Sequence, residues 1–289
     1  MKDVSGIPQS IDAGSPGSTA RYGESRPVVA HWLGCHRVDL EECGSTNDEA
    51  ARLARAGARH GTIVIAHAQR SGRGRDGHSW SSPPGAGLYL SAVLRPPLPI
   101  ADVPPVTLAI GIGACDAVCA AGAPAKLKWP NDILVGNRKL GGILVETQSQ
   151  GARLEAVIVG IGINLRGTPQ VDHAITLAEA IGTAARAGSA GPRSDAEGPR
   201  AGSVDKEAFV ANLLAHVERW VDRYVAVGVD AIVQAWQQRM APGLRARATI
   251  DGDESTGEVV GLDRDGALLL RDDDGRVHRV RSGDVHVIR

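Results

Sequence analysis

Aromatic residues are scarce in this chain, and neither sign of charge is in excess. Phe, Trp and Tyr together make up 3% of the 289 residues, so we expect a core packed mainly with aliphatic side chains. Lys and Arg number 32 and Asp and Glu number 33, for a formal net charge of −1. Such a balance excludes a global attraction to nucleic acid or to an anionic membrane. Any anion site must therefore be local and built from a few placed cations.

Cysteine is also rare, and its four positions indicate neither a metal site nor a disulfide framework. Cys115 and Cys119 lie four residues apart in an apolar helical stretch, where we interpret both as small buried side chains. Cys35 and Cys43 have no partners at the spacing of zinc ligands.

A secretory leader and a long hydrophobic run are missing as well. The N-terminal part has no apolar core, and no apolar run reaches the ~18 residues of a membrane span. We therefore expect a soluble, cytoplasmic protein. Residues 1–30 are rich in Ser, Gly, Pro and charge, and we expect them to be disordered.

Residues 31–241 contain strand patterns mixed with a few helices. Thr46 and Glu49 have the spacing of a capping box at the start of a helix. Helices are also expected at 106–121, 205–227 and 229–240, and strands at 62–66, 87–94, 126–129, 133–135, 140–147 and 154–163. Because several strands follow one another directly, the pattern favours an α+β fold with a mixed or antiparallel sheet. Residues 183–204 show no period and are expected to be a flexible insertion.

The pattern changes after Pro242 to short strands separated by Asp-Gly turns. Five of them are expected, at 246–250, 257–262, 267–271, 277–281 and 285–288. They predict a small β-barrel over residues 242–289. The chain is thus divided into a disordered segment 1–30, a larger domain 31–241 and a C-terminal barrel 242–289.

The most unusual segment alternates glycine and arginine from Gly72 to Gly77, directly after a strand. Glycine permits positive φ, so that successive backbone N–H groups can surround an anion. Arg73 and Arg75 add planar cations that suit carboxylate and phosphate. The glycine spacing matches a dinucleotide-binding fingerprint, but no strand–loop–helix unit follows, which disfavours a nicotinamide site. Taken alone, such a run is more often a solvated surface loop.

Three further segments place polar groups at a strand end, two of them beside glycine. They are Lys128–Asp132, a proline turn whose terminal carboxylate suits magnesium, and the glycine-containing segments Arg138–Leu144, which contains Lys139, and Gly160–Asn164. Each alone is an ordinary turn or hairpin. Together with the glycine–arginine loop they predict a pocket lined by strand ends, with cations gathered over it.

This combination of segments resembles the biotin protein ligases. The motifs that stand in the family's order and spacing are Ser45-Thr46-Asn47, Gln69, Gly72–Arg75, Lys128–Asp132, Lys139–Leu144 and Gly160–Asn164. The resemblance extends from about Val38 to the C-terminus. It implies a class II synthetase-like catalytic domain with a mixed sheet, followed by a small Src-homology-3-like barrel.

The resemblance also implies a reaction with ATP, biotin and Mg²⁺. Biotin is activated to biotinyl-5′-AMP with release of pyrophosphate, and is then transferred to a lysine of a biotin carboxyl carrier protein. The carrier would belong to acetyl-CoA carboxylase or a related carboxylase.

Individual residues receive roles from the same resemblance. Lys139 is the expected catalytic residue, together with Arg73 and Arg75 of the loop. The biotin site is expected to comprise Ser45, Thr46, Asn47, Gln69, Arg73, Gly74, Arg75, Trp80, Lys139 and Gly142. The nucleotide site is expected to comprise Gly72, Arg75, Lys128, Asn131, Asp132 and Asn164, with Asp132 as a magnesium ligand. Some members place an aromatic over the adenine; the matching stretch 173–176 has none, so the adenine contact stays open.

Two other functions share parts of this pattern. A lipoate ligase or octanoyl transferase of related fold is the nearest alternative, and the arginine loop and the final barrel favour biotin. A regulator that binds biotin or a nucleotide without turnover would have less need of Lys139 and both arginines. Fewer than ~45 residues precede the motifs, too few for the helix-turn-helix domain of some members, so no DNA contact is expected. No membrane contact is expected, and a homodimer is left open.

Overall fold

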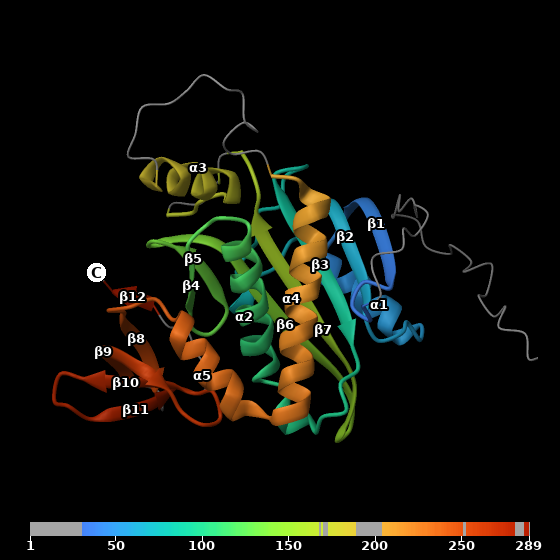
Figure 1. Ribbon diagram of the computed structural model, residues 1–289. Helices are drawn as coiled ribbons and strands as arrows, with labels where there is room; N and C mark the ends of the chain where they lie inside the picture. The colour runs from blue at the N-terminus through green and yellow to red at the C-terminus, as the bar shows by residue number, and fades with distance from the viewer. Residues whose placement is uncertain are drawn as a thin grey trace, which may run out of the picture.

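Two separate β-sheets organise the molecule. The structure, a computed structural model, describes residues 31–167, 169, 173–188, 204–250, 253–280 and 286–288. The expected disordered segment 1–30 and most of the expected insertion 183–204 lie outside the described residues. Figure 1 shows the larger sheet with helices packed on it and the smaller sheet beside one end. The α+β fold with a small C-terminal β domain is thereby confirmed.

The larger sheet has seven strands. In spatial order these are β1 (His36–Cys43), β2 (Thr62–Gln69), β3 (Gly87–Leu94), β7 (Arg153–Asn164), β6 (Arg138–Gln150), β5 (Asp132–Val135) and β4 (Ala125–Lys128). β1 pairs with β2 in parallel, and all other neighbouring strands are antiparallel. The sheet is therefore mixed, as the sequence predicts.

Helices cover both faces of this sheet. α2 (Val106–Ala120), α4 (Lys206–Val227) and α5 (Val229–Arg239) pack on one face, where α2 and α4 cross in front of the strands in Figure 1. Their core includes the stripe Leu88, Leu90, Ala92 and Leu94 of β3, as predicted. The short helix α1 (Thr46–Arg55) packs on the opposite face through Ala50 and Ala54. α3 (Leu177–Gly188) follows the sheet in the chain.

The apolar segment Ile100–Ala120, which comprises the turn η2 (Ile100–Asp102) and α2, is long and hydrophobic enough to cross a membrane by length and composition. Its mean hydropathy is 1.6, so the expectation of no span-length run was too strict. However, 72% of its most apolar window is buried inside the protein. Since Ile110 and Ile112 are fully enclosed beneath the sheet, the segment serves as a core helix.

The smaller sheet comprises the C-terminal strands. Its order is β11 (Val277–Val280), β10 (Leu268–Asp272), β9 (Asp253–Leu262), β8 (Arg245–Ile250) and β12 (His286–Ile288), with all neighbours antiparallel. β11 also lies against β8, so the sheet curls on itself, as a small barrel requires. A hydrogen bond of 3.0 Å from Trp129 Nε1 to the Gly266 carbonyl joins it to the larger domain.

Four local expectations were wrong. The cap of α1 is Ser45 rather than Thr46, whose hydroxyl instead contacts Gln69. Strand β1 was missed because this edge strand is mostly half-exposed and carries charged residues. Residues 183–188 belong to helix α3 instead of a flexible insertion. Of the two cysteines expected to be buried in α2, Cys115 is buried but Cys119 is exposed.

Candidate active site

The floor of the site is the face of the large sheet that carries α1. Residues directly opposite one another on neighbouring strands share a face, and here Gly142 of β6, Gly162 of β7 and Tyr89 of β3 form one such row. The next row contains Gly160 and Ser91. Because the glycines have no side chains, the floor is lowered at the centre, while α1 covers the sheet further along.

Trp80 lies on this glycine floor. A Cβ atom placed on Gly162 would be 2.6 Å from Cε2 of Trp80, and one on Gly142 would be 3.5 Å from its Cζ3. Within the described part of the chain, the indole Nε1 is buried without a hydrogen-bond partner. Only glycine permits this approach of ring and strand, which gives Gly162 a steric reason to be glycine.

The N-terminus of α1 supplies a buried polar network at one end of the floor. The backbone N–H of Thr46 donates to Oε1 of Gln69 at 2.7 Å, and Gln69 Nε2 donates to Ser82 Oγ at 2.8 Å. Ser91 Oγ lies 2.6 Å from Oδ1 of Asn47 and 2.7 Å from the Thr46 hydroxyl. Ser45, Thr46 and Asn47 are each at most 4% exposed. The network fixes several donors and acceptors in place for a polar ring.

Lys139 stands at the other end, beside a carboxylate. The pairing of β5 with β6 contains a bulge, since Ile133 is opposite Gly141 while Leu134 is opposite Lys139. A bulge re-aims a side chain. Lys139 Nζ lies 2.6 Å from Oδ1 of Asp132 and 5.6 Å from the centre of the Trp80 ring.

Lys128 approaches the same carboxylate from the strand before the turn. Its Nζ lies 3.7 Å from Oδ2 of Asp132, which is 14% exposed. Two cations thus meet one acid, and the local charge is positive.

The glycine–arginine loop closes the site as a small hairpin. Arg73 forms a bridge with Ser79, the N–H of Gly74 donates to the carbonyl of His78 at 2.7 Å, and the N–H of Trp80 donates to Gly72 at 2.8 Å. We call residues 72–80 the arginine hairpin. Asp76 at its tip has a φ of 52°, a conformation that Asp adopts more readily than most residues.

Two adjoining cavities result. One of about 280 Å³ is bounded by the α1 terminus, the arginine hairpin and the glycine floor; the other, of about 1170 Å³, extends toward β4 and residues 173–176. Lys128, Lys139, Asp132, Trp80 and Tyr89 line both. Two neighbouring chambers with cations between them suit two ligands whose anionic groups meet.

Most of the predicted site residues lie together in these cavities. The smaller cavity is lined by Ser45, Thr46, Asn47, Gln69, Arg73, Gly74, Arg75, Trp80, Lys128, Asn131, Asp132, Lys139 and Gly142, and the larger by Asn164. Gly72 lines neither and instead packs behind Trp80 and Ser82. The amide of Asn131 donates to the Ile143 carbonyl at 2.7 Å, so it also shapes the turn.

Comparison with known proteins places this geometry in a family. Residues 44–164 match the Biotin/lipoate A/B protein ligase family, and residues 245–287 match the Biotin protein ligase C terminal domain. A biotin–[acetyl-CoA-carboxylase] ligase of Paracoccus denitrificans is 35% identical over 82% of this chain and 95% of its own length. The chain belongs to the biotin protein ligase family.

Further biotin protein ligases agree in sequence and in fold. A ligase of the same name from Mycobacterium tuberculosis is 31% identical over 91% of this chain and 93% of its own length. The structure of the Aquifex aeolicus biotin protein ligase in complex with biotin and ATP superposes with a TM-score of 0.69 at 26% identity, covering 88% of this chain and 99% of that chain. The bifunctional ligase/repressor BirA of Bacillus subtilis is 30% identical over 93% of this chain and 78% of its own length.

Several residues of this ligase site were not predicted from the sequence. Ser91 and Tyr89 belong to the floor and lie on β3, which was interpreted only as an apolar strand. A hydroxyl group inside such a strand could have indicated a site. Burial raises the pKa of Tyr89 to about 12, and its hydroxyl donates to the Pro83 carbonyl at 2.9 Å. Lys126 and Arg166 add cations to the larger cavity.

The segment 173–176, in which no aromatic was found, lies beside the ligase's Lys139. The N–H of Lys139 donates to His173 at 2.8 Å, and the N–H of Ile175 donates to Lys139 at 3.0 Å. His173, Ala174 and Thr176 line the larger cavity. Backbone bonding therefore fixes this stretch without an aromatic side chain.

Proposed function

We propose that this chain activates biotin with ATP and transfers it to a lysine of a biotin carboxyl carrier protein. The observation that carries the proposal is the position of Lys139 and Lys128 between two cavities, with Arg75 in the smaller of them, which is built over a glycine floor. In this assignment biotin takes the smaller cavity, with its ureido ring toward Thr46 and Gln69, and ATP takes the larger.

The cations answer the main difficulty of the first step. A biotin carboxylate oxygen must attack the α-phosphorus of ATP, and both groups are anionic. Two unit charges at 4 Å repel by about 4 kcal/mol at an effective dielectric of 20, so neutralising groups lower the barrier substantially. Lys139 is our candidate for the residue that touches both groups, since fixed donors also stabilise the charge that develops on the phosphate. The bond from the α-phosphorus to the bridging oxygen breaks and pyrophosphate leaves.

The second step needs an acceptor amine. The lysine of the carrier attacks the carbonyl carbon of the mixed anhydride, AMP leaves, and the lysine loses a proton as the amide forms. The names of the relatives from Paracoccus denitrificans and Mycobacterium tuberculosis support an acetyl-CoA carboxylase carrier as the partner.

Magnesium fits this site as a companion of ATP. Among the described residues no group of three or more His, Cys, Asp and Glu could hold a metal. Asp132 offers one carboxylate, which already contacts Lys139. Since Mg²⁺ is commonly held by one or two carboxylates together with substrate phosphates, Asp132 would be its protein ligand. When bound, the ion would neutralise phosphate charge.

We further propose that residues 31–241 act as the catalytic domain, residues 242–289 as the barrel domain, and that the enzyme works in the cytoplasm. The proposed carboxylase carrier would have to be in the same compartment as the enzyme.

Biotin-dependent ATP–pyrophosphate exchange tests the function directly. We expect exchange with biotin and ATP, and loss of exchange in Lys139→Ala. Arg138→Ala is the matched control, because Arg138 is the adjacent cation but pairs with Glu179 at 2.7 Å, away from both cavities. Exchange with lipoate and not with biotin would assign the related lipoate activity instead. Unchanged exchange in Lys139→Ala would remove Lys139 from the chemistry.

A further inference from the structure

The two arginines of the arginine hairpin have different surroundings. Both line the smaller cavity, but they contact different carboxylates. The carboxylate contact of Arg75 is Asp76, its own neighbour in the hairpin, at 3.6 Å. Arg73 reaches carboxylates on two other elements of the protein, Asp48 on α1 and Glu146 on β6. The two arginines therefore differ in where their carboxylate partners lie.

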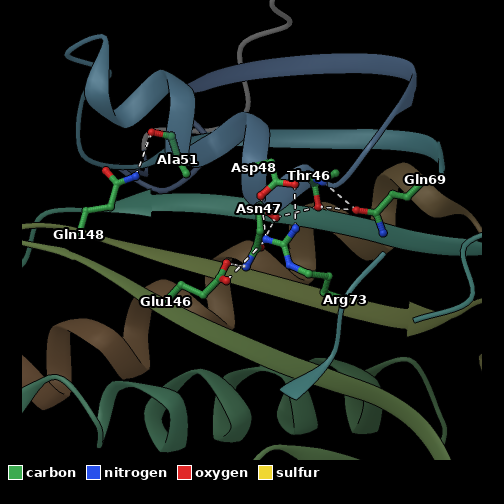
Figure 2. Close-up of polar contacts among 9 residues, drawn as sticks. Thr46, Asn47, Asp48, Ala51, Gln69, Arg73, Glu146 and Gln148 are labelled. Atoms are coloured by element: carbon green, nitrogen blue, oxygen red, sulfur yellow. Dashed lines mark hydrogen bonds and ion pairs between the residues drawn. The ribbon is translucent and has the colours of Figure 1, made fainter. Parts of the chain in front are cut away.

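The contact between Arg73 and Asp48 is bidentate. Nη1 of Arg73 donates to Oδ2 of Asp48 and Nη2 donates to Oδ1, both at 2.7 Å. Figure 2 shows the guanidinium of Arg73 facing the carboxylate of Asp48. Nη2 also lies 3.5 Å from Oε1 of Glu146. Exposed ion pairs usually contribute little, but a planar two-bond geometry within a network is the arrangement in which they hold a group in place.

These contacts also compensate the charge of Arg73. Two carboxylates face one guanidinium, and hydrogen bonding to Asp48 raises the pKa of Arg73. Asp48 and Glu146 line neither of the two cavities. A substrate anion in the smaller cavity would therefore gain little from Arg73 as it stands. Arg75, by contrast, has no second carboxylate partner among the residues that the structure describes.

Glu146 extends the contact toward the biotin end of the site. Asn47 Nδ2 donates to Oε2 of Glu146 at 2.6 Å, and the other end of that amide lies 2.6 Å from Ser91 Oγ (Figure 2 shows Asn47 between Glu146 and Thr46). Asn47 rests on Gly160, where a Cβ would be 2.4 Å from its Oδ1. The acid that touches the hairpin thus also orients a residue of the buried network.

We propose that Asp48 and Glu146 are positioning residues that clamp Arg73, and that Arg73 is the anchor of the arginine hairpin rather than a ligand of the substrate's anionic groups. The clamp sets where the hairpin holds Arg75 and Trp80 over the biotin cavity. This inference rests on the proposed function for its kinetic consequences, while the placement of the hairpin itself is independent of it.

The test compares Asp48→Asn, Arg73→Gln and the double variant by pyrophosphate exchange and by amide hydrogen exchange of residues 72–80. Each single variant should raise KM for biotin about tenfold, the scale of a slightly misplaced binding group. KM for ATP should change less than about twofold, because the hairpin contributes mainly to the smaller cavity. Amide exchange in the hairpin should accelerate about tenfold. The double variant should be no worse than either single variant, since both remove the same contact.

Two further variants sharpen the result. The charge-exchanged variant Asp48→Arg/Arg73→Asp should restore a large part of the biotin KM and of the hairpin protection. If Arg73 contacted the substrate itself, this exchange would not restore either. Glu49→Gln is the matched control: it removes the adjacent acid of α1, which pairs with Arg52 at 3.0 Å and not with the hairpin. It should leave both readouts unchanged.

Two outcomes would overturn the proposal. If Asp48→Asn leaves biotin KM and hairpin exchange unchanged, the clamp does not position the hairpin. If Arg73→Gln impairs activity while hairpin exchange stays at the wild-type rate, Arg73 contacts the substrate itself. Should the wild-type protein show no biotin-dependent pyrophosphate exchange, the proposed function fails, and hairpin exchange in Asp48→Asn still decides whether the clamp exists.

Discussion

The two faces of strand β7 differ in what they do, although they alternate along the same twelve residues. On one face Val157, Val159, Ile161 and Ile163 are at most 3% exposed and belong to the large core under α2 and α4. On the other, Ile158 packs under α1, and then Gly160 and Gly162 lie under Asn47 and Trp80. The first face is filled by its own side chains, whereas the second is shaped by side chains brought from elsewhere.

This difference separates stability from binding within one strand. A residue of the filled face contributes through apolar burial and close packing, so its loss is felt in the unfolding free energy. A glycine of the other face contributes through the space that it leaves. Substitutions at neighbouring positions of β7 should therefore affect different quantities, the unfolding free energy on one face and biotin affinity on the other.

Truncation on the filled face should give the largest effect. Ile163 is fully buried and lines neither cavity, so Ile163→Ala should lower the unfolding free energy by about 3 kcal/mol through lost burial and a residual cavity. Urea denaturation measures the change, and Ile163→Val should show about 1 kcal/mol. Biotin affinity of the folded variant, measured by calorimetry, should stay close to that of the wild type. A large loss of affinity with little loss of stability would remove the distinction between the faces.

Adding a single methyl group on the other face should do the reverse. In Gly162→Ala the new Cβ would be 2.6 Å from the Trp80 ring, so the indole must shift. We expect biotin affinity to fall about tenfold, which corresponds to about 1.4 kcal/mol. The unfolding free energy should change by less than about 1 kcal/mol. The steric cost in the folded state is partly offset because Ala restricts the unfolded chain more than Gly does.

A double-mutant cycle identifies the cause of that loss. If the clash with Trp80 is responsible, Gly162→Ala should add little to the loss already present in Trp80→Ala. Fully additive losses would mean that the methyl group acts on the ligand or on the backbone instead.

The filled face is also the one that sequence predicts well. The alternation in β3 placed Leu88, Leu90, Ala92 and Leu94 together, and all four lie in the core. Asp205 caps α4 by accepting from the N–H groups of Glu207 and Ala208, close to the predicted start of that helix. Burial and capping are local or periodic properties, so they can be recovered from residue order alone.

The binding face is only partly recoverable in this way. Its motifs were identified because they resemble a known family, and the structure gathers them around two cavities. The contact of Asn47 with Glu146 joins residues 99 positions apart, and no local pattern indicates that pairing. Thr46 has the spacing of a capping residue, yet tertiary contacts with Gln69 take its hydroxyl. Polar contacts between residues that are far apart in the chain could therefore not be predicted from the sequence.

Tyr89 should give the smallest effect, because it belongs to the binding face but is itself 3% exposed. In Tyr89→Phe the hydrogen bond to Pro83 is lost, at a cost of about 1 kcal/mol in unfolding free energy at pH 8.

Burial raises the pKa of Tyr89 from 10 to about 12, so the folded state favours the neutral phenol. Its contribution is complete below pH 10, where both states are protonated, and declines as pH rises through the interval up to about 12. The variant should therefore lose less stability across that interval than the wild type does. Tyr224→Phe is the control in urea titrations at each pH, since burial also raises the pKa of Tyr224 to about 12 but Tyr224 lies on α4 in the large core. If the two variants lose similar stability and only Tyr89→Phe weakens biotin binding, the phenol of Tyr89 helps shape the cavity. If both leave binding untouched, its contribution to the floor is limited to packing.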